Sequence, residues 1–515
     1  MKRWIYAIAV VIVLGFGFFI RKNLHDRFPG YSLDLKIIPG SPSALSAGFS
    51  KFSITPQVSD SWKDVNGNLE FDADGPDTWT DGNGNGKFDP VWLAGFHNNR
   101  PAQGVHDSLW ARTMVLDDGK TRLAVVAIDA IGFGADDALE VRQSFPEEWK
   151  ITHAFIVSSH SHQAPDLIGI YGKSRYVSGV DPGYMALVKS GIRASVGDAV
   201  GRLRPAELTY ARNLEDAKSL VTDLRDPQVT DHGLRIIHAK DTLTGETLGT
   251  LVSWANHPET LEDKNLLVSS DYVHYLREGI EKGVRRDDKV LHQGKGGITV
   301  FINGAIGGMM TTWSGFPITD PFTGAQHKDP DYLKTEAQGL QLAMLALNAI
   351  DSSTTKIKKS SVSLRAISVE LPLDNSLYRL GAVLGIFSRG LSGVWKVRSE
   401  VAAWKLGPAT FLHLPGELYP EIANGGIEMP EGRDFEIKPV EVPALRSKMP
   451  GEYHFVVGLS NDLIGYIIPK SQWDTEPPFT FNSKEAPYGE INSLGPETGP
   501  LIYNFSRRVL RELPD

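Results

Sequence analysis

The chain has 515 residues, 41% of them apolar, which is enough to form the core of one large domain or of several smaller ones. Its formal net charge is -9 and it has no basic cluster beyond the N-terminus, which argues against nucleic acid as a partner, because phosphate binding needs clustered Lys and Arg. It contains no cysteine, which excludes disulfides, thiolate metal ligands and a cysteine nucleophile. A lipid or small-molecule substrate is therefore favoured, and any transition metal must be held by His, carboxylate or phenolate ligands.

The N-terminus carries an uninterrupted apolar run over residues 4–20, with two basic residues on either side. This length is at the short end of what spans a bilayer, and no small-residue cleavage site follows it. We interpret residues 1–27 as an export signal or, preferably, an uncleaved membrane anchor, although basic residues on both flanks leave the orientation poorly defined. The expected location is membrane-anchored, with residues 28–515 outside the cytoplasm, periplasmic or extracellular.

Short apolar runs that end in a polar or glycine residue recur along residues 28–515. This pattern is typical of strands whose C-terminal ends meet at a crevice, the usual place for a site in an α/β fold. We therefore predict a single large α/β domain with mixed sheets and a site at the strand ends, and helices near residues 271–283, 332–349 and 496–513. The runs are LAVVAI before Asp129, AFIVSS before His160, TLVSWAN before His257, TVFINGA before Gly307 and Gly308, TFLHLPG before Glu417, and FVVGLSND leading to Tyr466.

Residues 60–92 form an insertion rich in Asp, Asn and Gly, in which the pattern D-x-N-G-N-x-x-F-D occurs twice, 17 residues apart. Side-chain oxygens at its first, third, fifth and ninth positions can converge on a hard cation. The twelfth position lacks the bidentate Glu of an EF-hand, so the loops would be shorter calcium loops, the first completed by Asp74 or Asp77, or metal-free Asx-turns. The candidate calcium ligands are Asp64, Asn66, Asn68 and Asp72 in the first copy, and Asp81, Asn83, Asn85 and Asp89 in the second.

Histidines follow two of the predicted strands. His160 and His162 stand two residues apart, a spacing that places both imidazoles on one face of an extended chain, and His257 precedes Pro258. Alone, the pair is equally compatible with ordinary surface or core histidines. Together with a carboxylate, however, two histidines and an open position are typical of catalytic zinc.

Several sequence blocks carry a resemblance to a known family over nearly everything from Ala47 to the C-terminus except the insertion. The blocks are AGFSKFSITP, GVHDSLWARTMVLDDG, HAFIVSSHSHQAPD, LRDPQVTDHGLRIIHAKD, VSWANHPETL, FLHLPGELYPE and GLSNDLIGYIIP. In this order they resemble the catalytic domain of the neutral/alkaline, non-lysosomal ceramidases. The resemblance implies a zinc-dependent hydrolase of a linear amide, an N-acyl lipid such as ceramide. It also implies site residues: zinc held by His160, His257, Glu417 and Tyr466, a substrate contact at His162, and a matching arginine at Arg225.

The chain departs from the family at the nucleophile. The family carries a Gly-Asp-x-Ser-Pro-Asn segment with a nucleophilic serine, whereas this chain reads INGAIGGMMTT, with Gly308 in place of Asp and Met310 in place of Ser. A methionine cannot attack a carbonyl, so we expect zinc-activated water to attack, His162 to act as general acid and base, and Tyr466 or Arg225 to stabilise the oxyanion. We also expect no C-terminal immunoglobulin-like domain of the kind that the family carries.

Each site residue has a plainer interpretation. Glu417 could cap a helix beginning near Tyr419, Tyr466 could be a core aromatic, and Arg225 could pair with a neighbouring Asp in solvent. Asp129 could accept a hydrogen bond from a ligand imidazole.

The alternative functions are hydrolysis of another ester, amide or lactone, and a catalytically silent, metal-containing surface binding protein. The oligomeric state stays open.

Overall fold

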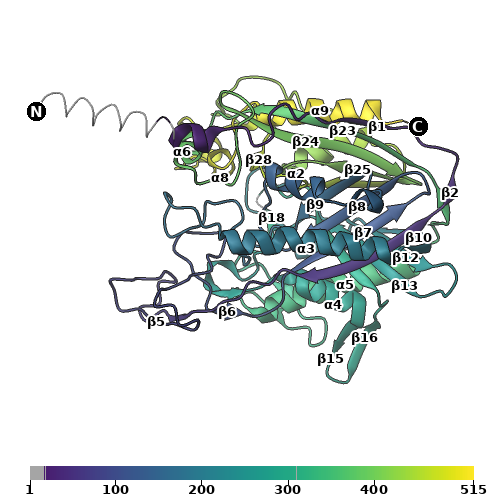
Figure 1. The fold of residues 1–515 in the computed structure, drawn as a ribbon, viewed down its shortest axis with the longest axis horizontal. Helices are drawn as coiled ribbons and strands as arrows, with labels where there is room; N and C mark the ends of the chain where they lie inside the picture. Colours follow the sequence, from purple (N-terminus) through teal and green to yellow (C-terminus); the bar gives the residue numbers. More distant parts are fainter. Residues whose placement is uncertain (1–16, 18, 309, 515) are drawn as a thin grey trace, which may run out of the picture.

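The computed structural model describes residues 17, 19–308 and 310–514 (Figure 1). The predicted membrane anchor at residues 4–20 lies almost wholly outside these residues. Within the part of the chain that is described, no helix is both long and apolar enough to cross a bilayer. What the structure does describe is two β-sheets stacked face to face, with helices on the outer face of each.

The larger sheet has nine strands and mixes parallel with antiparallel pairing. Its only parallel neighbours among the described strands are β8 with β9 and β13 with β17. In pairing order the strands are β17 (Ile298–Asn303), β13 (Thr247–Trp254), β12 (Leu234–Asp241), β10 (Arg204–Asn213), β3 (Ser46–Ser53), β7 (Trp110–Asp117), β8 (Arg122–Ile128) and β9 (His153–Ser158), with β21 (Lys356–Ile357) also pairing β10.

The smaller sheet has five strands, and β25 and β27 form its parallel pair. In pairing order its strands are β1 (Asp34–Ile37), β23 (Val362–Pro372), β24 (Lys396–Leu406), β25 (Ala409–His413) and β27 (Tyr453–Val457). Short two-stranded ladders complete the β-structure: β2 (Ser43–Ala44) with β22 (Lys359–Ser360), β4 (Ser61–Lys63) with β5 (Thr78–Thr80), β6 (Gly104–Val105) with β14 (Leu267–Val268), β11 (Thr222–Asp223) with β18 (Met310–Thr311), β15 (Gly283–Arg286) with β16 (Lys289–Gln293), β19 (Ile318–Thr319) with β20 (Gln326–His327), and β26 (Glu417–Leu418) with β28 (Tyr466–Ile467).

The core lies between the two sheets and on their outer faces, giving four layers in the order helix, sheet, sheet, helix (Figure 1). Aromatic rings from both sheets stack between them, where the ring centroid of Phe155 in β9 lies 3.8 Å from that of His413 in β25. This double burial explains why the strands read as continuous apolar runs. The covering helices are α3 (Pro182–Gly201), α4 (Tyr272–Lys282) and α5 (Tyr332–Ser352) on the larger sheet, and α9 (Thr498–Glu512) on the smaller one.

The sequence predictions for the fold are confirmed. Each of the six apolar runs is a strand, namely β8, β9, β13, β17, β25 and β27, and the three expected helices are α4, α5 and α9. The α/β class with mixed sheets is likewise confirmed. The shorter helices are α2 (Ala135–Gln143), α6 (Ser376–Leu384), α7 (Pro420–Asn424) and α8 (Tyr488–Ile491), with 3-10 turns at Glu147–Trp149, Asp216–Leu220, Glu262–Lys264, Leu445–Lys448, Lys470–Gln472 and Thr480–Asn482.

The insertion folds as two related halves. Strands β4 and β5 pair antiparallel with Trp62 opposite Trp79, and the phenyl rings of Phe71 and Phe88 pack 4.3 Å apart. Each half begins with an Asp, Asp60 or Asp77, whose carboxylate accepts two backbone N–H groups from the loop of the other half. These bonds join Asp77 to Val65 and Asp72 (both 2.9 Å), and Asp60 to Gly82 (3.1 Å) and Asp89 (2.8 Å). The repeat therefore extends over residues 60–72 and 77–89, and the two copies cap each other.

Candidate active site

The first site histidine stands where the chain leaves β9. The backbone N–H of His160 donates to the carbonyl of Ala130 at 2.9 Å, and His160 has a φ of 70°, a left-handed conformation that costs a non-glycine residue about 1 kcal/mol. Its Nδ1 lies 2.6 Å from the carbonyl oxygen of Ile131. Because a carbonyl only accepts, Nδ1 must carry the proton, which leaves the lone pair on Nε2.

The second histidine follows β13 and is held in the same way. Both the backbone N–H and the Nδ1 of His257 lie 2.9 Å from the carbonyl oxygen of Met310, so its Nε2 is also the nitrogen with a lone pair in the neutral ring. Asn303, the last residue of β17, joins the two histidine loops. Its side-chain amide donates to the carbonyls of Ser159 at 2.9 Å and Asn256 at 3.0 Å. One side chain thus fixes the separation of the two loops.

A carboxylate and a phenol reach the same point from the two-stranded β26–β28 ladder. Glu417 of β26 and Tyr466 of β28 are directly opposite each other in a parallel ladder. The Oε2 atom of Glu417 lies 3.2 Å from Nε2 of His257 and 3.5 Å from Nε2 of His160, and the Tyr466 hydroxyl lies 3.5 Å from Nε2 of His257. The structure therefore brings together four residues that the sequence places in four separate motifs.

The Gly307–Gly308 turn, which follows β17 of the larger sheet, lies directly against strand β26 at this point. The backbone N–H of Gly307 donates to the carbonyl of Leu418 at 2.8 Å, and a Cβ at Gly307 would collide with the carbonyl oxygen of Glu417. Only glycine allows this approach of one backbone to another. Gly307, the first glycine after the β17 run, is thus a packing requirement of the Glu417 strand.

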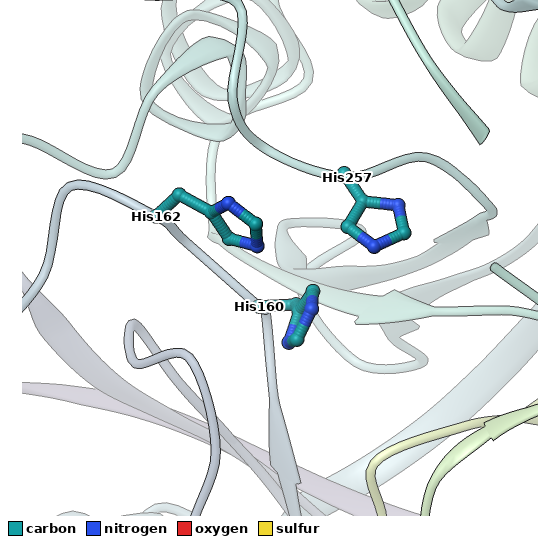
Figure 2. A group of neighbouring side chains, drawn as sticks. All are labelled: His160, His162 and His257. Carbon is teal, nitrogen blue, oxygen red and sulfur yellow. The ribbon is translucent and has the colours of Figure 1, made fainter. Parts of the chain in front are cut away.

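His162 completes the group (Figure 2). Its ring centroid lies 4.9 Å from that of His160 and 5.5 Å from that of His257, and one ring nitrogen from each of the three lies within 4.8 Å of the others. Nδ1 of His162 lies 3.0 Å from the Glu259 carboxylate, while Nε2 is buried without a hydrogen-bond partner among the described residues. Gly95, with a φ of 110°, packs against this imidazole where a side chain would collide. This buried group could hold a metal ion.

The electrostatics around Glu417 favour positive charge. Burial lowers the pKa of His160 to about 3, helped by the neighbouring His257 and His162. Burial also acts to lower the pKa of His257, but its hydrogen bond to Glu417 and the charge of Glu259 outweigh burial and raise it to about 9. For Glu417 itself, burial is outweighed by His160 and His257, which lower its pKa. A site that retains a proton against burial is one that would also favour a bound cation.

An apolar pocket opens beside this group, with about 970 Å³ not filled by protein atoms, including the part open to solvent. His160, His162, Glu417 and Tyr466 form part of its wall. Its one cationic lining residue, Arg389, is neutralised by the buried Asp462 at 2.9 Å. Most of the remaining lining is aliphatic or aromatic: Ile131, Ile168, Ile170, Tyr171, Leu373, Tyr378, Ala382, Phe387, Leu391, Val397, Leu463, Ile464, Tyr488 and Leu494. This lining suits an apolar group that lies next to a polar centre.

Met310, which stands in place of the family serine, contributes through its backbone. Its carbonyl oxygen accepts both hydrogen bonds from His257. Its side chain is fully buried in the core beneath α4 and α5, and its sulfur accepts the backbone N–H of Asp231 at 3.4 Å. The neighbouring Thr312 hydroxyl donates to Gln338 at 3.1 Å. The side chain of Met310 is therefore part of the core.

Arg225 lies against the start of α7. Its guanidinium forms an ion pair with the fully buried Glu421 and stacks over the Tyr419 ring at 4.3 Å. The plainer interpretation, an ion pair with a neighbouring Asp in solvent, is wrong, because only 12% of the Arg225 side chain is exposed and its partner is Glu421. No contact between Arg225 and the three histidines is present among the described residues.

Two other expectations are decided by hydrogen bonds. Asp129 accepts from Arg277 at 2.8 and 3.0 Å and not from an imidazole, because the backbone carbonyl of Ile131 already occupies Nδ1 of His160. Glu417 does not cap α7, whose N-cap residue is Tyr419 and which has no side-chain cap.

Sequence reasoning missed three residues of the site: Glu259, Asn303 and Gly95. Glu259 lies two residues beyond His257 and Asn303 closes the β17 run, so both adjoin motifs already singled out. Their roles depend on contacts with residues far along the chain. Gly95 has no local signal, since its need for glycine arises from its φ of 110° and from contact with His162, and neither is visible in the sequence.

Comparison with known proteins supports the fold. No family model matches the sequence. A neutral ceramidase from Pseudomonas aeruginosa is similar in structure, with a TM-score of 0.62 and 14% sequence identity over 92% of this chain and 75% of that one. A ceramidase complexed with C2 is similar with a TM-score of 0.64, 14% identity, and coverage of 92% and 76%. The chain thus has the fold of the ceramidase catalytic domain, as the sequence resemblance predicted.

Proposed function

We propose that the protein is a zinc-dependent hydrolase that cleaves the amide bond of an N-acyl lipid such as ceramide. The observation that carries this proposal is the convergence of His160, His257, Glu417 and Tyr466, from two loops of the larger sheet and from the β26–β28 ladder, beside an apolar pocket. The similar structures support it, since both are ceramidases by name. An amide at the junction of a polar centre and an apolar pocket is the geometry that an N-acyl lipid presents.

The donor set fits zinc. Two imidazoles with protonated Nδ1 atoms, one carboxylate and one phenol are ligands of the type that zinc takes, and backbone carbonyls orient both rings. We assign these four as ligands and not the three histidines alone, because His162 faces Glu259. When bound, zinc supplies a water of lowered pKa and polarises the scissile carbonyl, so no side-chain nucleophile is required.

The remaining steps fall to the residues of the chain. Glu259, 3.0 Å from Nδ1 of His162, orients that ring and leaves its Nε2 toward the pocket to take and return a proton. Without a metal, burial and the charge of Glu417 raise the pKa of Tyr466, and its hydroxyl is the group that would donate to the developing oxyanion. Arg225 is a weaker candidate for that role, since Glu421 already pairs with it.

The proposal includes two further elements. The apolar run at residues 4–20 would anchor the protein in a membrane, with the catalytic domain outside the cytoplasm, where its lipid substrate resides. The two loops of the insertion would each bind a structural calcium ion, since their Asp and Asn side chains gather around Asp72 and Asp89.

Metal analysis of the purified chain, combined with fatty-acid release from a panel of N-acylsphingosines with and without chelator, tests the proposal. We expect one zinc per chain and release that chelator abolishes and added zinc restores. Zinc without release would favour hydrolysis of another ester, amide or lactone. Absence of zinc would favour the catalytically silent binding protein.

A further inference from the structure

Helix α6 exposes an apolar stripe at one end of the molecule. Leu377, Leu380 and Leu384 follow the i, i+3, i+7 spacing of a single helix face and are 62%, 48% and 37% exposed. Nearby, Tyr488 and Ile491 of α8 are 49% and 46% exposed. We call these five residues the α6–α8 face. Contiguous exposed apolar residues on a soluble domain mark an interaction surface.

This face borders the pocket. The opposite side of α6 contributes Tyr378 and Ala382 to the pocket wall, and Tyr488 both lines the pocket and is half exposed. The two helices are joined by Asn375, the N-cap of α6, whose side-chain amide donates to the carbonyl of Ile491 at 2.7 Å. A molecule resting on the α6–α8 face would therefore lie beside the pocket that leads to His160.

The N-terminal segment indicates what covers this face. The helical residues 19–24 lie against α6, where the Asn23 side chain donates to the carbonyl of Val383 at 2.9 Å and packs on Gly385 (Figure 1). This helical segment contains the last two residues of the apolar run 4–20, followed by the basic pair Arg21 and Lys22. An apolar segment ending in two cations suits the boundary between acyl chains and phosphate headgroups.

We propose that the α6–α8 face docks on a lipid bilayer and that the substrate passes from the bilayer past α6 and α8 into the pocket. The route of the substrate rests on the proposed hydrolase activity, whereas the docking rests on the proposed anchor and not on that activity. Two experiments separate these parts.

The first experiment measures docking without using activity. Because the chain has no cysteine, a single spin label can be placed through Leu380→Cys in the full chain, reconstituted into phospholipid nanodiscs. We expect its collision rate with oxygen to exceed that with a water-soluble nickel complex, as for a site in lipid. The matched control is Leu243→Cys, 81% exposed on the turn between β12 and β13, whose label should favour nickel. A Leu380 label open to nickel, or shielded from both reagents by protein, overturns the proposal.

The second experiment measures delivery of the substrate. The variant Leu377→Gln/Leu380→Gln/Leu384→Gln should lose about tenfold or more in hydrolysis of an N-acylsphingosine embedded in vesicles, while hydrolysis of a short-chain, monomeric N-acyl amide stays unchanged. Leu243→Gln should change neither. An equal loss on both substrates would mean that α6 only shapes the pocket, and no loss on vesicles would remove the delivery route. If the wild type hydrolyses neither substrate, the proposed function fails while the label result on docking still stands.

Discussion

The histidine site and the Asp/Asn insertion are two candidate metal regions within the described part of the chain, and they are built in opposite ways. The side chains of the histidine site come from loops and short strands spread between His160 and Tyr466, and all are buried. The insertion draws its oxygens from residues 60–89, and most of them are exposed. In the first region the tertiary structure places the donors. In the second a repeated local sequence does so.

The difference also appears in the hydrogen bonds of the donors. In both His160 and His257, Nδ1 bonds to a backbone carbonyl oxygen, while Nε2 faces the Glu417 carboxylate. In the insertion, Asp64 and Asp81 accept backbone N–H groups of their own loops, which close on themselves. The comparison teaches that the fold orients the groups of the histidine site, whereas most hydrogen bonds of the insertion loops lie within each loop or join its two halves.

The largest expected effect comes from removing one ligand of the histidine site. His257→Ala should abolish bound zinc and lower kcat/KM by roughly a thousandfold or more, because the metal then loses a ligand that the backbone of Met310 had oriented. The measurements are metal analysis and steady-state turnover. His238→Ala, at another buried histidine that contacts Thr250 at 2.9 Å, should keep its zinc. Retained turnover in His257→Ala would contradict the site assignment.

A smaller effect is expected from the residue that joins the two loops. Asn303→Ala should weaken zinc affinity by about 10- to 100-fold, because the carbonyls of Ser159 and Asn256 lose their shared donor and the two histidines lose their fixed separation. Competition with a chromogenic chelator measures this affinity. The control is Asn213→Ala, at a half-buried asparagine whose side chain bonds to the neighbouring Asp216, and equal zinc affinity in both variants would show that the loops need no such link.

Met310→Ala should affect stability more than catalysis. Truncating this fully buried side chain should lower the free energy of unfolding by about 2–4 kcal/mol, while kcat/KM of the folded protein stays within a few-fold, because the carbonyl that holds His257 remains. Urea unfolding and turnover measure the two quantities. A variant that keeps its zinc but is inactive would assign a catalytic role to the Met310 side chain.

The Tm of the protein should rise by a few degrees when calcium binds to the insertion. Protein stripped of metal and reloaded with zinc alone should gain a few degrees in Tm when calcium is added, because binding to the folded loops stabilises them. The double variant Asp64→Ala/Asp81→Ala should not respond. An unchanged Tm for the wild type would favour two metal-free Asx-turns, as the hydrogen bonds within each loop allow.

The smallest effect is expected from acid. The pKa of Asp81 is lowered chiefly by the backbone N–H of Gly86, and that of Asp89 by the amides of Asn83 and Asn85. Since these pKa values are lower in the folded insertion than in the unfolded chain, the stabilisation is present above about pH 4 and is lost as the pH falls further. Amide exchange of the second loop, corrected for intrinsic rates, should accelerate between pH 5 and pH 3. Exchange within α5 is the control.

Much of the fold could be predicted because its signals are local. Runs such as LAVVAI and AFIVSS are long enough to identify β8 and β9, and their C-terminal ends indicate where a site would form. The repeat at residues 64–72 and 81–89 is visible in the letters themselves. The pairing between its halves could not be predicted. Asp60 and Asp77 each accept hydrogen bonds from the loop of the other half, and this depends on the antiparallel pairing of β4 with β5.

The sequence by itself determined the α/β class, the strands, and the motifs that supply His160, His257, Glu417 and Tyr466. Only the tertiary structure decided that these residues meet, that Arg225 pairs with Glu421, and that the carbonyl of Met310 rather than its side chain serves the site. The physical reason is the separation along the chain over which each kind of interaction acts. Strand and turn preferences act over a few residues, whereas an opposed pair such as Glu417 and Tyr466 exists only once β26 and β28 have been brought together by the packing of the whole domain.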